Sequence, residues 1–168
     1  MSKKKEQRLK DIEQKAFLVF SQEGFDAQMS EIARACSIGH GTLYRDFKDK
    51  DALFEHILRI SIKRAEERWQ AESLAWFTRS LLESWTPCAS LFAYVPPKKR
   101  GPLNTHFSNV DSAAAPYLGQ NVRLWRACVF QSALDKNPID QACSVLMDLF
   151  GQPSSKPMER QAVEGWRS

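Results

Sequence analysis

The sequence predicts an all-α fold in which a three-helix head is joined by a long helix to a short helical second domain. Apolar side chains recur three and four residues apart along most of the 168 residues, which is the period of an amphipathic helix. No stretch alternates apolar and polar residues as a half-buried strand does. We expect the head to span residues 1–50, the second domain residues 51–151, and a flexible tail residues 152–168.

Three helices are expected in the head. The first covers residues 7–23, and Gly24 is placed to end it in a left-handed conformation. A second, of about two turns, covers residues 29–36, and a third covers residues 40–46. Gly39 stands between these two, where it permits a sharp change of direction and serves as the N-cap of the third helix.

The second domain is expected to be helical as well. Asp49 is a good N-cap for a long connecting helix over most of residues 50–70. A helix over residues 74–85 follows, with a short continuation over residues 88–95. The proline- and glycine-containing residues 96–115 predict a loop or irregular segment.

Two more helices are predicted towards the end of the chain. Pro116 suits the first turn of a helix over residues 117–134, because a helix start does not need its missing N–H. Another helix covers residues 139–150. Both have wide apolar faces.

The third helix of the head combines an apolar and a polar side. Leu43 and Phe47 are expected to face inward at helical spacing. His40, Thr42, Tyr44 and Arg45 do not fit that inward face together, so several of them point outward. Two short helices joined by a turn and braced by a first helix form a helix-turn-helix unit, which spans Gln28 to Phe47.

These outward residues suit contact with duplex DNA. Arg45 can pair with a guanine or a phosphate, Thr42 with a phosphate or a thymine methyl group, and the Tyr44 hydroxyl with a phosphate. The candidate DNA contacts of the whole unit are Gln28, Ser30, His40, Gly41, Thr42, Tyr44, Arg45, Lys48 and Lys50. Gly41 lets a sugar–phosphate strand approach closely, and Lys50 stands at a helix N-terminus that favours an anion.

The net charge of +4 is mild, from 24 Lys and Arg against 20 Asp and Glu. Its distribution is uneven, because residues 1–15 carry six basic side chains, namely Lys3, Lys4, Lys5, Arg8, Lys10 and Lys15. A basic N-terminal arm of this kind suits phosphate contact, although solubilising tails have the same composition.

The run GFDAQMSEIARACSIGHGTLYRDFKDKDALF, residues 24–54, resembles the N-terminal DNA-binding domain of TetR-type bacterial transcriptional regulators. Its most specific parts are GTLYRDF and KDKDALF, supported by Glu31, Ile32 and Ala33 in the second helix. The resemblance covers about residues 8–60. It implies a sequence-specific regulator that acts on an operator in double-stranded DNA, most often as a repressor.

The same resemblance implies a helical second domain that binds a small ligand and forms a homodimer through its last two helices. Those helices would be residues 117–134 and 139–150. A small apolar or aromatic ligand would fit a pocket lined by aromatic side chains, for which the candidates are Trp69, Phe77, Trp85, Phe92, Phe107 and Trp125. Aromatic residues at helical spacing also form plain core or dimer contacts. No cofactor is expected.

Other function classes remain open. The head is also compatible with a protein–protein module that keeps the helix-turn-helix fold, and a small helical enzyme is a weaker alternative. No catalytic residues are recognisable, and His40 has no Cys, Asp or Glu at metal-ligand spacing, so we expect no metal site. The chain has no apolar run long enough to cross a membrane and no CxxC pair, which indicates a cytoplasmic protein.

Overall fold

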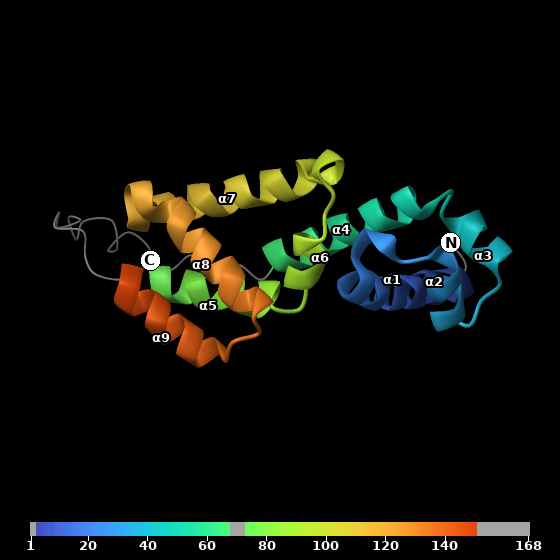
Figure 1. The fold of residues 1–168 in the computed structure, drawn as a ribbon, viewed down its shortest axis with the longest axis horizontal. Coiled ribbons are helices and arrows are strands. Elements are labelled where there is room, and N and C mark those ends of the chain that lie inside the picture. The colour runs from blue at the N-terminus through green and yellow to red at the C-terminus, as the bar shows by residue number, and fades with distance from the viewer. Residues whose placement is uncertain (1–2, 68–72, 151–168) are drawn as a thin grey trace, which may run out of the picture.

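The computed structural model describes residues 3–67 and 73–150, and within them every regular element is helical. The molecule is elongated, with a head at one end, a body at the other, and α4 running from one to the other (Figure 1). The α-helices are α1 Lys3–Glu23, α2 Met29–Ala35, α3 His40–Asp46, α4 Lys50–Glu66, α5 Leu74–Trp85, α6 Ala89–Ala93, α7 Gly101–Leu118, α8 Val122–Leu134 and α9 Ile139–Phe150. The short 3-10 turns are η1 Gly24–Asp26, η2 Pro97–Lys99 and η3 Gly119–Asn121. The predicted all-α class is confirmed.

The head forms around α1, α2, α3 and the first half of α4. Phe20 on α1 meets Phe54 on α4 edge to face, with the ring centroids 5.0 Å apart. Phe25 packs against the same Phe54 ring at 5.2 Å. Leu43 on α3 is fully buried in this core. Because α4 supplies core residues to the head, the domain limits 1–50 and 51–151 remain a prediction.

Two predicted helix-end signals in the head, the Asp49 N-cap and the Gly24 stop, are confirmed. Asp49 caps α4, since its Oδ1 accepts a hydrogen bond from the Ala52 N–H at 2.7 Å. Gly24 has a φ of 65°, as expected of a left-handed helix stop. A side chain at this position would also collide with the body, because an added Cβ would lie 2.9 Å from Tyr94 Cγ. Gly24 therefore both turns the chain and leaves room for Tyr94 at the end of α6.

The body packs around two pairs of aromatic side chains. Phe77 on α5 stacks on Trp125 of α8 with centroids 5.6 Å apart, and the Trp125 Nε1–H donates to Thr78 Oγ1 at 3.2 Å. Trp85 on α5 lies edge to face with Phe107 of α7 at 5.7 Å. The body is joined to α4 through α7, which lies along the second half of that helix (Figure 1).

The predicted irregular segment over residues 96–115 is wrong, because α7 occupies Gly101–Leu118. Its true start signal is Pro102, which lies in the first turn where a missing N–H costs nothing. Pro116 lies in the last turn instead. There it removes only the bond to the carbonyl of Ser112, and because Ser112 is exposed, that carbonyl is accessible to water.

The predicted helix over residues 117–134 is consequently wrong at its start. Gly119 ends α7 with a φ of 52°, η3 follows, and α8 covers Val122–Leu134 alone. The predicted helix over residues 139–150 is confirmed as α9. The predicted tail over residues 152–168 lies outside the described residues.

Candidate DNA-binding surface

The turn between α2 and α3 is made by Ser37. Its φ of 54° is left-handed, and it directs two hydrogen bonds that close α2: Ser37 N–H to the Arg34 carbonyl and Ile38 N–H to the Ala33 carbonyl, both at 3.0 Å. This is a Schellman motif. Gly39 is the N-cap of α3, as predicted, but its φ of −69° is open to any residue. Ser37 therefore makes the change of direction, and the prediction that Gly39 makes it is wrong.

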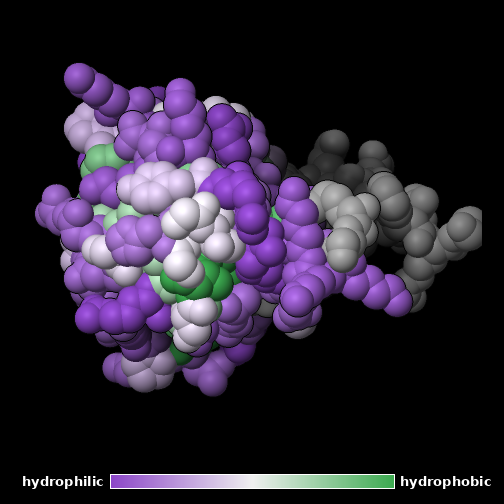
Figure 2. Space-filling model, turned by 90° about the vertical axis from the view of Figure 1, so that its right-hand side faces the viewer, coloured by the Kyte–Doolittle hydropathy of each residue, from purple (hydrophilic) through white to green (hydrophobic). Residues whose placement is uncertain are grey.

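The third helix presents two different faces. Leu43 is 0% exposed and Phe47 8% exposed, so both point into the head as predicted. His40 and Arg45 are exposed, and Tyr44 keeps 48% of its surface accessible. Thr42 is half-buried. Figure 2 looks onto the end of the molecule that carries α3, and hydrophilic side chains dominate it around a small apolar area.

An ion pair between α1 and α3 sets the position of the candidate recognition helix. Arg8 donates from Nε to Asp46 Oδ2 at 2.9 Å and from a terminal nitrogen to Oδ1 at 3.2 Å. The Asp46 side chain is only 3% exposed. Two parallel bonds between a planar guanidinium and a carboxylate fix geometry as well as distance. The sequence predicted Arg8 to be part of the basic N-terminal arm. In the structure it instead holds α3 in place through Asp46, a role that the sequence did not indicate.

The two candidate lysines beside α3 differ in their surroundings. Lys48 is exposed. Lys50 is half-buried, donates from Nζ to the Phe25 carbonyl at 2.7 Å, and lies 4.6 Å from the centroid of the Phe25 ring. Lys50 thus ties η1 to the start of α4, and its remaining N–H groups are the ones available for a phosphate.

Gln28 and Ser30 flank the first residue of α2, and both are exposed. The Gln28 amide donates to the Asp26 carbonyl at 2.9 Å, while its backbone N–H donates to Glu31 Oε2 at 3.0 Å. The second contact satisfies one of the free N–H groups at the helix start. Gln28 is therefore partly engaged in ordering this turn, whereas Ser30 stands free at the surface.

Gly41 has no structural requirement inside the protein. An added Cβ would meet no atom within 4 Å, and the residue does not adopt a positive φ. A glycine in the first turn of a helix is unfavourable relative to alanine when nothing demands it. The space in front of Gly41 is therefore open to a partner.

The residues predicted to line a ligand pocket divide into three groups. Phe77, Trp85 and Trp125 are 0% exposed and fill the body core. Phe92 and Phe107 line a cleft of about 340 Å³ together with Arg100, Leu103 and Phe130. Trp69 lies outside the described residues. Only the second group borders free space in the part of the chain described.

No three His, Cys, Asp or Glu side chains gather as a metal site within residues 3–67 and 73–150. Over the same residues, no helix has the length and apolar character needed to cross a bilayer.

Residues 13–57 match the family model for bacterial regulatory proteins of the tetR family. The match begins inside α1, covers α2 and α3, and ends inside α4. The chain carries a TetR-family DNA-binding domain. It is a DNA-binding transcriptional regulator, and the family match gives this class rather than an enzyme class.

Solved structures of transcriptional regulators extend the likeness in fold to the body. A transcriptional regulator from Rhodococcus sp. RHA1 superposes with a TM-score of 0.64 at 18% identity, covering 85% of this chain and 95% of that one. The regulator FadR from Bacillus subtilis, solved in complex with stearoyl-CoA, gives 0.62 at 19% identity, covering 84% and 97%. At these identities the likeness establishes the fold. No curated protein matches the sequence.

Proposed function

We propose that this TetR-type regulator is a ligand-responsive repressor that binds its operator as a homodimer in the cytoplasm. The observation that carries the proposal is the outward polar face of α3, on which Tyr44 and Arg45 are exposed while Leu43 is buried. A recognition helix must present side chains to base edges in the major groove while its apolar side anchors it to the head. Thr42, Tyr44 and Arg45 are the residues assigned to this contact.

The phosphate backbone would be held by the flanking cations. Lys48 is exposed beside α3, and Lys3, Lys4, Lys5 and Lys10 are exposed along the first turns of α1. Contacts of this kind fix orientation without reading sequence, and they make affinity depend on salt. Two heads related by a two-fold axis would read half-sites roughly 34–36 Å apart, or a modest stretch of that spacing.

A homodimer through α8 and α9 supplies that two-fold axis. Leu124 on α8 keeps 61% of its surface exposed, and Val145 and Leu149 on α9 keep 50% and 65%. Val145 and Leu149 are four residues apart and lie on one side of α9. Exposed apolar residues on two neighbouring helices indicate a surface that a second copy covers.

Ligand response is proposed by analogy with FadR, which was solved with stearoyl-CoA. A ligand changes DNA affinity only through different affinities for two arrangements of the heads. In this chain α4 connects head and body (Figure 1), so a ligand that moves α4 would move the head. The sites available to such a ligand are the clefts of the body.

The first prediction separates stability from DNA binding at Gly41. Gly41→Ala should raise the free energy of unfolding by about 0.5 kcal/mol, because alanine favours a helix and nothing obstructs its Cβ. The same methyl group should weaken operator binding, because it occupies the space kept for the sugar–phosphate strand. Urea unfolding and fluorescence anisotropy on one preparation measure both. A variant that is more stable and binds DNA as tightly as wild type would remove Gly41 from the interface.

The second prediction concerns base reading. Arg45→Ala should lower affinity for the preferred operator by about 1–3 kcal/mol and relax the preference at one base position. Anisotropy titrations with the operator and with a scrambled duplex, at a stated salt concentration, measure the two effects. Lys98→Ala is the control, since Lys98 is an exposed cation on η2, outside α3 and outside the proposed dimer helices. If Arg45→Ala and the control variant lose the same operator affinity, the effect is one of general charge and not of base recognition.

Selection of duplexes from a random pool by the full chain tests the proposal as a whole. Recovery of a motif with two related half-sites is the expected result. Binding without any preferred sequence would refute the proposed function and favour the protein–protein module.

A further inference from the structure

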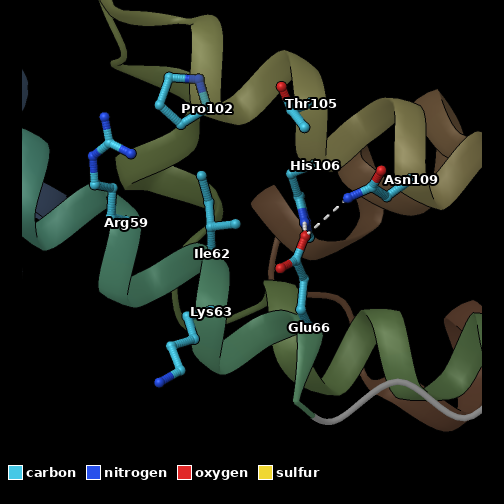
Figure 3. A pocket seen from close by; sticks show the side chains of 8 residues that line it. All are labelled: Arg59, Ile62, Lys63, Glu66, Pro102, Thr105, His106 and Asn109. Carbon is cyan, nitrogen blue, oxygen red and sulfur yellow. Dashed lines mark hydrogen bonds and ion pairs between the residues drawn. The ribbon is translucent and has the colours of Figure 1, made fainter.

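A cleft of about 520 Å³ lies between α4 and α7, on the side of the molecule where these two helices run together (Figure 3). Its lining residues are Arg59, Ile62, Lys63 and Glu66 from α4, and Pro102, Thr105, His106 and Asn109 from α7. This volume falls in the range of small-molecule sites. The cleft contains none of the aromatic residues that the sequence had suggested for a ligand pocket.

Arg59 is the feature that distinguishes this cleft. It is exposed, and it has no hydrogen bond or ion pair among the described residues. The arginines that line the two other described clefts have partners: Arg64 lies 3.7 Å from Glu13 Oε2, and Arg100 donates to the Val95 carbonyl at 3.0 Å. A guanidinium at the mouth of a concave site, with five N–H donors unused, is suited to a carboxylate.

At the opposite end of the cleft, the Glu66 carboxylate is already hydrogen-bonded. Glu66 reaches across to α7, where its Oε1 lies 3.2 Å from His106 Nδ1 and accepts from the Asn109 amide at 3.4 Å (Figure 3). The Trp85 indole N–H donates to His106 Nε2 at 3.0 Å, so the ring proton is on Nδ1 and points to Glu66. The carboxylate of Glu66 is therefore held by two donors, and it is not paired with Arg59.

The remaining walls are suited to an apolar group. Ile62 lies between Arg59 and Glu66 on α4, and Pro102 faces it from the start of α7 (Figure 3). Lys63 points away from the cleft in Figure 3, and its Nζ is 3.7 Å from Glu67. Since the Lys63 side chain is 77% exposed, it is free to turn towards a second anionic oxygen.

We propose that the cleft between α4 and α7 binds a small organic carboxylate, with its anionic group on Arg59 and its apolar body between Ile62 and Pro102. The proposal rests on the proposed function in one respect, namely that the bound carboxylate is the effector. A ligand held by both helices would bias the position of α4 relative to α7, and α4 begins in the head. The carboxylate therefore changes operator affinity by the ratio of its affinities for the two arrangements.

The test uses the full chain and two probes, 2-naphthoate and octanoate, with 2-naphthamide and octanamide as neutral counterparts of the same shape. Calorimetric titration should give a Kd below about 1 mM for at least one carboxylate, with its amide bound at least about tenfold more weakly. Arg59→Gln should weaken carboxylate binding about tenfold, while Arg123→Gln, an exposed arginine on α8, should leave it unchanged. Glu66→Gln should tighten it a few-fold, because a like charge beside the anion is removed.

Thermal melting of each variant shows whether it is folded, and only folded variants are compared. Failure of both carboxylates to bind wild type below about 10 mM, or equal binding by Arg59→Gln and wild type, overturns the site. Selection of a DNA motif on the same preparation separates the two proposals. A protein that selects DNA but binds neither carboxylate refutes the cleft alone, and one that binds carboxylates through Arg59 but selects no motif refutes the effector role and the proposed function.

Discussion

Leu149→Glu on α9 is expected to lower affinity for a two-half-site operator by roughly 10²–10⁴-fold, the usual loss when linked binding becomes single binding. Leu149 keeps 65% of its surface exposed, so the substitution does not disturb the core of one protomer. In the proposed dimer the same position is covered by the partner, where an unpaired carboxylate is costly. Two chains that cannot associate would each bind one half-site independently.

Sedimentation equilibrium and anisotropy measure the association and the operator affinity separately. Ser108→Glu provides the control, because Ser108 is exposed on α7 and α7 lies on the other side of the body from α9 (Figure 1). A Leu149→Glu protein that stays dimeric at micromolar concentration would place the two-fold interface elsewhere. One that becomes monomeric yet binds the full operator like wild type would contradict the paired-head arrangement.

His106→Ala is expected to lower the free energy of unfolding by about 3 kcal/mol. The ring is 1% exposed and lies between three helices, taking the Trp85 N–H on one side and facing Glu66 on the other. Removing it opens a cavity and leaves the buried indole N–H of Trp85 without its acceptor. His56→Ala is the control, because that side chain is 41% exposed and should cost far less. If urea unfolding gives the same decrease in the free energy of unfolding for His106→Ala and His56→Ala, the buried contact between His106 and Trp85 does not contribute as proposed.

The same histidine predicts a pH dependence of stability. Burial lowers the pKa of His106 below the value of 6.5 expected in the unfolded chain, and the nearby Glu66 only partly opposes this effect. The unfolded chain therefore binds the proton more readily, so stability is full above about pH 6.5 and falls as the pH drops towards the folded pKa. The fall in the free energy of unfolding between about pH 7.5 and about pH 5.5 should be smaller in His106→Ala than in wild type. An unchanged or steeper fall would exclude His106 as its source.

The helices of the head were predictable because their signals are local. Apolar spacing marks α1 and α2, and Gly24 ends the first helix. Asp49 caps α4, because its side-chain oxygen accepts a hydrogen bond from the Ala52 N–H. Each of these features depends on residues within one or two turns of the chain. The inward side of α3 could also be predicted, because Leu43 and Phe47 are the apolar residues of a short polar stretch.

The error at α7 has a physical cause. A proline is compatible with the first turn of a helix and, less often, with the last, so residue type alone does not distinguish Pro102 from Pro116. What selects the actual helix is the contact of α7 with α4 and α8, which buries Leu103, Val110 and Ala114. Because this packing involves residues far apart in the sequence, the local sequence pattern could not predict it.

The sequence by itself determined the helical class, the helix-turn-helix and the residues that face out from α3, because periodicity and capping act over a few residues. The tertiary structure alone decided that Arg8 braces α3 through Asp46 and that Phe77 and Trp125 stack in the core. It alone also decided that Arg59 lines a cleft with no ion-pair partner among residues 3–67 and 73–150. Those facts depend on which side chains meet after the helices have packed. A charge or an aromatic ring has the same appearance in the sequence whether folding gives it a partner, buries it, or leaves it free.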